Sequence, residues 1–385
     1  MKNRPSFFSD RLGPAVLAVA GVLLVAPPPG RTAVSQERGS TLRAGRELFQ
    51  SACANCHGSD GRGASQSLVG FNLRIRDFTD CQAAAREPDS DWVAVALQGG
   101  PARGFSELMP AFAGLLTVEE VSLIVNYLRT FCADAEWPRG ELNLPRALVS
   151  EKAFPEDEAV LTAAVETGGM GLITNEIVYE QRLGRRNQIE ISVPFGWRKT
   201  VSEAGKPDWT SNLGDLAVGV KRALYHSFEH GTILSAAAEL IMPTGDEARG
   251  FGKGTFILEP FVSYGQLLPA DFFLQAQVGM ELPAQSRKAE KEGFLRFVFG
   301  RSFDTGRWGR SWSPMVELLG ARELRGKAMI DWDIVPQLQV TLNRRKNIMA
   351  SLGVRFPLNN ISGRNTAVIF YLLWDWFDGT LFQGW

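Results

Sequence analysis

The chain has 385 residues and a formal net charge of −1, with 41 basic and 42 acidic side chains. This length is enough for two domains. The near-zero net charge gives no electrostatic reason to expect a nucleic-acid partner, and we predict none.

The first 35 residues have the pattern of a secretory signal peptide. Lys2, Arg4 and Arg11 precede an apolar run over residues 12–26, which ends in a cluster of Pro and Gly. The run is short for a membrane-spanning helix, so an uncleaved anchor is the less favoured alternative. We therefore predict a signal peptide over 1–35, a mature chain that begins near Gln36, and export to a compartment that permits disulfides.

The sequence CANCHG at residues 53–58 has the spacing of a covalent haem attachment site. Two thiols, Cys53 and Cys56, reach neighbouring vinyl groups of one porphyrin, and His57 follows at once as the proximal iron ligand. The alternative is a zinc site of four thiolates, completed by Cys81 and Cys132. We favour one covalent haem c, because a zinc ribbon has no need for His57 and usually brings a second C-x-x-C.

Met109 is the candidate for the second axial ligand of the iron. The remaining histidines, His226 and His230, lie far along the chain, and Met109 is the one methionine between the predicted cleavage site and Met170. A lone Met more often fills a gap in a core, but this one lies on a loop, in ELMPAF, just before a predicted helix. Ligation by His57 and Met109 raises the haem potential and leaves no open position for a substrate. We therefore predict electron transfer and not an enzyme.

Two predicted helices flank these motifs. Thr117 and Glu120 form a capping box in front of an apolar stripe, and an earlier helix begins near Thr41 and runs into CANCHG. The stretches GRELFQSACANCHGSDGRG, MPAF and VNYLRTF resemble small mono-haem cytochromes c, over roughly residues 40–132. The resemblance implies that the first and last helices cross in front of the haem, where Gly45 and Phe49 meet Tyr127.

Cys81 and Cys132 do not belong to the common pattern of that family. In an oxidising compartment they can form a disulfide that closes a long loop, which contributes about 4 kcal/mol in a chain-entropy estimate. Free buried thiols are the alternative. We assign residues 36–135 to a mono-haem cytochrome c domain and 136–157, rich in Pro and charge, to a linker.

From residue 158 onward the hydrophobic period changes to two, which is typical of β-strands. Eleven clear strands begin at Gly171, a further one is predicted over 158–166, and GTILSAAAELIMP is assigned as a strand from its neighbours. Long connections near 198–213, 243–254 and 283–291 alternate with short turns. Outer-membrane barrels have short periplasmic turns and long outer loops, so we predict an antiparallel transmembrane barrel of about 12 strands over 158–385.

The polar strand faces are predicted to line the lumen. Alternation alone fits a soluble sandwich or a lipocalin-like barrel as well. Strand length, the even count, the loop asymmetry and an aromatic-rich last strand favour the membrane. The residues predicted to project inward are Gln275, Gln277, Glu281, Asp331, Asp333 and Gln337.

The predicted fold class is an all-α cytochrome c-like domain followed by an all-β barrel, and this plan resembles the fused cytochrome-porins. The resemblance implies an outer-membrane protein that transfers electrons. Because this chain has a full cytochrome domain and a barrel of about 12 strands is narrow, we expect the periplasmic haem to pass electrons at the mouth of the pore. Its expected partners are a periplasmic redox protein, outer-membrane lipid and a small extracellular redox substrate or metal ion. The alternative is a channel for small molecules with a tethered cytochrome that acts only as an electron carrier.

Overall fold

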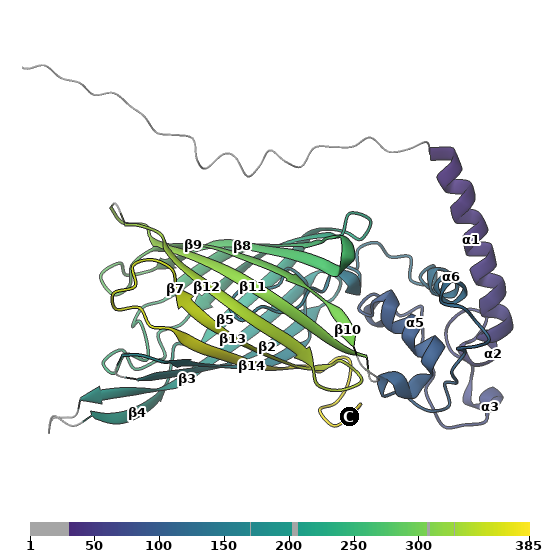
Figure 1. Ribbon diagram of the computed structural model, residues 1–385, viewed down its shortest axis with the longest axis horizontal. Coiled ribbons are helices and arrows are strands. Elements are labelled where there is room, and N and C mark those ends of the chain that lie inside the picture. Colours follow the sequence, from purple (N-terminus) through teal and green to yellow (C-terminus); the bar gives the residue numbers. More distant parts are fainter. Residues whose placement is uncertain (1–30, 170, 202–206, 306–308, 327) are drawn as a thin grey trace, which may run out of the picture.

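The computed structural model describes residues 31–385 except 170, 202–206, 306–308 and 327. The predicted signal peptide, apart from residues 31–35, lies outside the described residues. A helical region and a closed β-barrel lie end to end along the long axis of the molecule (Figure 1). Within the described part of the chain, none of the helices has the length and apolar character needed to cross a membrane.

The helical region is built on the crossing of its first and last helices. An added Cβ on Gly45 of α1 would lie 2.1 Å from the carbonyl oxygen of Leu123 in α6, so glycine permits the close approach. The rings of Phe49 and Tyr127 lie 5.6 Å apart beside this crossing. The helices are α1 (Arg31–Ala52), α2 (Ala54–His57), α3 (Gln66–Val69), α4 (Cys81–Ala84), α5 (Asp89–Gln98) and α6 (Val118–Leu128), with 3-10 turns η1 (Gly100–Arg103) and η2 (Gly140–Leu142).

The start of α6 has the predicted capping box. The Thr117 hydroxyl accepts from the Glu120 amide at 3.2 Å, and the Thr117 amide donates to the Glu120 carboxylate at 2.8 Å. Both donors would otherwise be unpaired at a helix start. The apolar stripe of α6 then packs against Phe49, which is fully buried.

The described residues after 157 form fourteen antiparallel strands, of which β4 and β10 lie outside the main ring, leaving twelve. The ring closes because β1 pairs with β14 and β9 pairs with β11. The twelve-stranded barrel is confirmed, including the strands predicted over 158–166 and within 231–243. The strands are β1 (Glu158–Glu166), β2 (Leu172–Leu183), β3 (Asn187–Val201), β4 (Pro207–Leu213), β5 (Ala217–Ser227), β6 (Thr232–Ile241), β7 (Ile257–Leu267), β8 (Phe272–Pro283), β9 (Glu292–Arg301), β10 (Phe303–Thr305), β11 (Arg310–Glu323), β12 (Asp331–Thr341), β13 (Ile348–Pro357) and β14 (Ala367–Asp375), with a 3-10 turn η3 (Pro269–Asp271) between β7 and β8.

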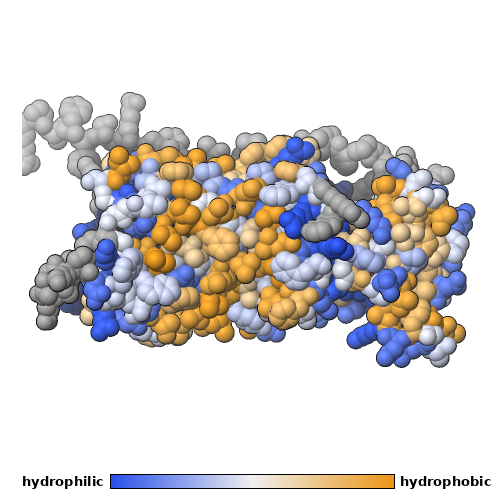
Figure 2. Space-filling view, turned by 60° about the horizontal axis from the view of Figure 1, so that its bottom comes forward, coloured by the Kyte–Doolittle hydropathy of each residue, from blue (hydrophilic) through white to orange (hydrophobic). Residues whose placement is uncertain are grey.

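The two faces differ in polarity on several strands. On β11, Val316 points outward and is 42 % exposed, whereas its neighbour Glu317 points into the barrel and is fully buried. Gln337 and Leu338 repeat this alternation on β12. Figure 2 shows the resulting hydrophobic band across the middle of the barrel surface. An apolar outer band is the arrangement of a barrel that faces lipid. The interior holds both these polar side chains and apolar clusters that pack against residues 142–157.

The connections at the two ends of the barrel differ in length. Short turns such as 184–186 and 268–271 lie at the end that faces the helical region, and long loops such as 242–256 and 284–291 lie at the other end. The predicted alternation of long loops and short turns is therefore present. These short turns lie at the end of the barrel that faces the helical region.

Residues 142–157, which precede β1, lie inside the barrel and are called the lumen segment below. The backbone amides of Leu148 and Ser150 donate to the Glu317 carboxylate at 2.8 and 3.0 Å. The amide of Glu156 donates to Gln188 of β3 at 2.7 Å, on another part of the wall. Most of the region predicted as a linker thus runs through the lumen.

Side chains of the barrel wall form hydrogen bonds with the lumen segment. Three of the predicted lumen residues are among them. Gln275 donates to the carbonyl of Pro145 at 2.8 Å, and Gln277 accepts from the amide of Glu151 at 3.2 Å. Gln337 accepts from the Leu148 amide at 3.0 Å. The other three predicted lumen residues, Glu281, Asp331 and Asp333, are half-buried nearer the long-loop end.

Candidate haem site

The CANCH motif occupies a single helical turn. The amides of Cys56 and His57 donate to the carbonyl of Cys53 at 3.2 and 2.9 Å, which brings both thiols and the imidazole onto one short helix, α2. Cys53 is half-buried and packs against the Phe49 core, whereas Cys56 is exposed. Burial, with the neighbouring Cys56 as a second cause, raises the pKa of the Cys53 thiol to about 11.

The His57 imidazole is held in an apolar setting. Its ring lies 5.2 Å from the ring of Phe78, which in turn lies 5.2 Å from Trp92. Burial lowers the pKa of His57, which favours the neutral imidazole that binds metals. Its Nδ1 atom is buried without a hydrogen-bond partner among the described residues. These properties suit an axial iron ligand better than a surface histidine.

The loop after the motif folds back over α2. The amides of Gly63 and Ala64 donate to the carbonyls of His57 and Cys56 at 2.9 and 2.8 Å. Gly61 has a φ of 76° and lies so close to Phe131 that an added Cβ would be 2.6 Å from the ring. The turn therefore requires glycine at position 61. The two hydrogen bonds of this loop hold the carbonyl groups of Cys56 and His57 in place.

Met109 lies in the loop between α5 and α6, as predicted, and its backbone is anchored on both sides. Its amide donates to the Ser106 carbonyl at 3.2 Å, and its carbonyl accepts from the Gly100 amide at 3.0 Å. Several apolar side chains in the segments between α2 and α6 are exposed: Leu68, Leu73, Leu108 and Leu115.

Cys81 and Cys132 are joined in a disulfide with their Cα atoms 5.2 Å apart. This bond links the start of α4 to the segment after α6. Two cysteines in a disulfide are not available to zinc, so the four-thiolate alternative does not fit. Two free thiols, one neutral imidazole and one thioether are present, and this donor set fits a covalently attached haem.

The helical region is docked on the short-turn mouth of the barrel by charged and aromatic contacts. Arg86 forms an ion pair with Asp157, and its guanidinium lies 3.8 Å from the centroid of the Phe377 ring. Lys346, in the turn between β12 and β13, lies 3.2 Å from Asp91 of α5. These residues could not be identified from the sequence, because a single charged residue gives no indication of its partner across an interface.

Two family models match separate parts of the chain. Residues 40–128 match the family described as cytochrome C oxidase, cbb3-type, subunit III. Residues 161–312 match the family described as putative MetA-pathway of phenol degradation. No curated protein matches the chain. With the closed ring described above, these findings make the chain a cytochrome c-like domain fused to a closed twelve-stranded barrel.

Among solved structures, the chain is similar to an outer membrane channel from Pseudomonas putida F1, with 14 % identity, a TM-score of 0.44, and coverage of 60 % of this chain and 98 % of the channel. It is also similar to the KdgM porin, with 9 % identity, a TM-score of 0.37, and coverage of 56 % and 98 %. Likeness at this level carries no argument about function. The closed ring and its apolar outer band support an outer-membrane location.

Proposed function

We propose that the protein is an electron-transfer protein of the outer membrane, with one c-type haem bound by Cys53 and Cys56. The observation that carries this proposal is the CANCH turn with a half-buried His57 imidazole of lowered pKa, in a domain docked on the mouth of a barrel. His57 is the proximal iron ligand, and Met109 is the second axial ligand. When bound, such a haem supplies a one-electron cycle between ferric and ferrous iron.

The proposed orientation places the cytochrome domain in the periplasm. Outer-membrane barrels have short periplasmic turns and longer extracellular loops. The helical region contacts the short-turn end through Arg86 and through the turn that carries Lys346. The electron-transfer partner of the haem is then a periplasmic redox protein, and the long loops face the outside.

Free passage of small molecules is less well supported than electron transfer. The lumen segment is hydrogen-bonded to β3, β8, β11 and β12, so it crosses the space that an open channel would need. One haem does not bridge a hydrocarbon core about 30 Å thick. Electrons that leave on the outer side therefore need a small redox substrate or metal ion that enters the barrel from the long-loop end.

The test uses full-length protein in liposomes, with the haem spectrum followed over time. An oxidant that cannot cross the bilayer is added first on one side and then on the other, and swelling in small sugars is measured in parallel. We expect haem oxidation from the cytochrome side, and swelling no faster than in empty liposomes. Fast swelling that is the same for oxidised and reduced haem would instead support the channel with a tethered carrier.

A further inference from the structure

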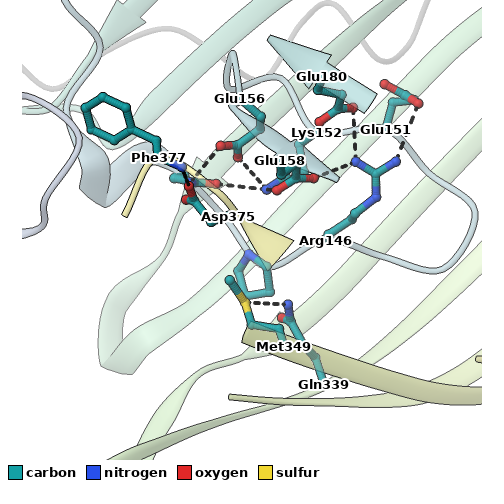
Figure 3. Close-up of polar contacts among 12 residues, drawn as sticks. Arg146, Glu151, Lys152, Glu156, Glu158, Glu180, Gln339, Met349, Asp375 and Phe377 are labelled. Carbon is teal, nitrogen blue, oxygen red and sulfur yellow. Dashed lines mark hydrogen bonds and ion pairs between the residues drawn. The ribbon is translucent and has the colours of Figure 1, made fainter. Parts of the chain in front are cut away.

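The lumen segment and the wall around it carry more buried negative than positive charge. Three of the cations there, Arg146, Lys152 and Lys221, form ion pairs with neighbouring carboxylates. Arg146 lies 2.7 Å from Glu158 and 3.1 Å from Glu180 (Figure 3). Lys221 lies 3.2 Å from Glu151. Buried Glu190 lies near them with no ion pair among the described residues, and the carboxylates that pair with these three cations are Glu151, Glu156, Glu158 and Glu180. Uncompensated charge in a buried site is costly.

Three of these carboxylates meet at one point. Glu151 of the lumen segment, Glu180 of β2 and Glu190 of β3 each offer an oxygen, and the three oxygens lie within 4.8 Å of one another. Ca²⁺ binds carboxylate oxygens at about 2.3–2.6 Å, so one ion can reach all three.

A second observation shows that one buried oxygen of this cluster lacks a donor. Glu180 is fully buried, yet its Oε2 atom has no hydrogen-bond donor among the described residues. Glu190 is also buried, and the donor that the structure gives it is the Gln188 amide at 3.4 Å, the outer limit of a hydrogen bond.

Glu317, in the same lumen, is a buried carboxylate with several hydrogen-bond donors. It accepts from the amides of Leu148, Val149 and Ser150, and from the Ser150 hydroxyl. The Gln337 side chain donates to it as well. Glu317 is therefore surrounded by donors, whereas Glu180 receives one donor, from Arg146 at 3.1 Å, and Glu190 receives only the long contact from Gln188 among the described residues.

We propose that Glu151, Glu180 and Glu190 bind a divalent cation of the Ca²⁺ class. The donors are all carboxylate oxygens, which suit hard cations and not Zn²⁺ or Cu²⁺. Because one ligand comes from the lumen segment and two come from the wall, the ion ties the segment to the barrel.

The experiment measures Ca²⁺ binding to the purified full-length holoprotein, after treatment with a chelator, by calorimetry and by thermal unfolding. We expect one Ca²⁺ per chain and a higher unfolding temperature when Ca²⁺ is present. Glu190→Gln should weaken binding at least tenfold. Glu292→Gln is the matched control, since Glu292 faces the lumen from β9 outside the cluster, and it should bind as the parent protein does.

The order of stability of Glu190→Gln and the parent protein should also reverse between chelator and Ca²⁺. In the chelator, Glu190→Gln should unfold at a higher temperature than the parent protein, because it removes a buried unpaired charge. In Ca²⁺ the parent protein should be the more stable. The proposal is overturned if the parent protein binds no Ca²⁺, if Glu190→Gln binds equally well, or if acidification replaces Ca²⁺ fully as the stabilising agent.

Discussion

Arg86 of the cytochrome domain and Asp157 at the end of the lumen segment form a buried ion pair at the mouth of the barrel. The Arg86 guanidinium also covers the ring of Phe377, which follows the last strand. One side chain therefore contacts both the segment that enters the barrel and the segment that leaves it. The position of the cytochrome and the position of the lumen segment are coupled through this residue.

Arg86→Ala should loosen the docked domain. Removing one partner of a buried ion pair leaves the other charge unpaired and typically costs about 3 to 5 kcal/mol. We expect faster hydrogen exchange in the lumen segment and earlier thermal release of the cytochrome domain. Arg62→Ala is the control, since Arg62 and Asp60 form an exposed pair that contributes little. Equal exchange in the two variants would contradict the coupling.

Met109→Ala should change the haem without unfolding the domain. Loss of the thioether removes the near-infrared absorbance band of Met-to-iron ligation and lowers the haem potential, because Met is the ligand that raises it. Covalent attachment through Cys53 and Cys56 should persist. The control is Met329→Ala, in the exposed loop before β12. An unchanged band in Met109→Ala would mean that another group is the axial ligand.

Loss of the Cys81–Cys132 disulfide should destabilise the cytochrome domain. The bond closes a loop with a sequence separation of 51, for which the chain-entropy estimate is about 4 kcal/mol. Cys132→Ser should lower the denaturation midpoint of the haem absorbance, and a mild reductant should have the same effect on the parent protein. The reductant should have no further effect on Cys132→Ser. A parent protein that is insensitive to reductant and titrates two further free thiols would contradict the bond.

The docked interface should become less stable as the pH rises from about 5 to 8. Burial, followed by the charges of Asp378 and Asp91, raises the pKa of Glu87 from 4.5 to about 8, against the opposing effects of Arg76 and Arg345. The folded protein holds this proton more tightly than the unfolded chain. Its contribution is therefore present below the unfolded pKa and is lost through the folded pKa, at no more than about 1.4 kcal/mol per pH unit.

Glu87→Gln isolates this contribution, because it keeps the neutral form at every pH. Its unfolding free energy should change less with pH than that of the parent protein over the same range. Glu107→Gln, in an exposed loop of the same domain, should keep the parent dependence. Parallel pH profiles for the parent protein and Glu87→Gln would show that Glu87 does not hold the proton.

The barrel could be predicted from the sequence because its signal is local and repeated. Alternation identifies a strand such as β12 without knowledge of its neighbours, and the even count with one-sided long loops follows from chain order alone. Even β6, whose run of Ala and Leu resembles a helix, was assigned correctly from its neighbours. The capping box of Thr117 and Glu120 was likewise visible, since its partners are three residues apart.

The path of residues 136–157 was not predictable in the same way. Lys152, Glu156 and Asp157 are charged residues close to Pro155, and this composition is typical of a solvated linker. Charged and polar residues can lie in a polar lumen as well as in solvent, provided that each has a hydrogen-bond or ion-pair partner on the wall. The partners, such as Gln188 and Glu317, come from strands far along the chain, so composition alone does not distinguish the two settings.

Fractionation of cells that make the full-length protein, followed by a stain for covalent haem, tests the central claim most directly. The account predicts one haem-stained band in the outer-membrane fraction, which resists external protease in intact cells and is cleaved once the outer membrane is permeabilised. Cys56→Ser, which removes one of the two attachment thiols, should weaken or abolish the stain while the polypeptide stays in the membrane. A colourless protein, or a haem-stained protein that dissolves without detergent, would contradict the account.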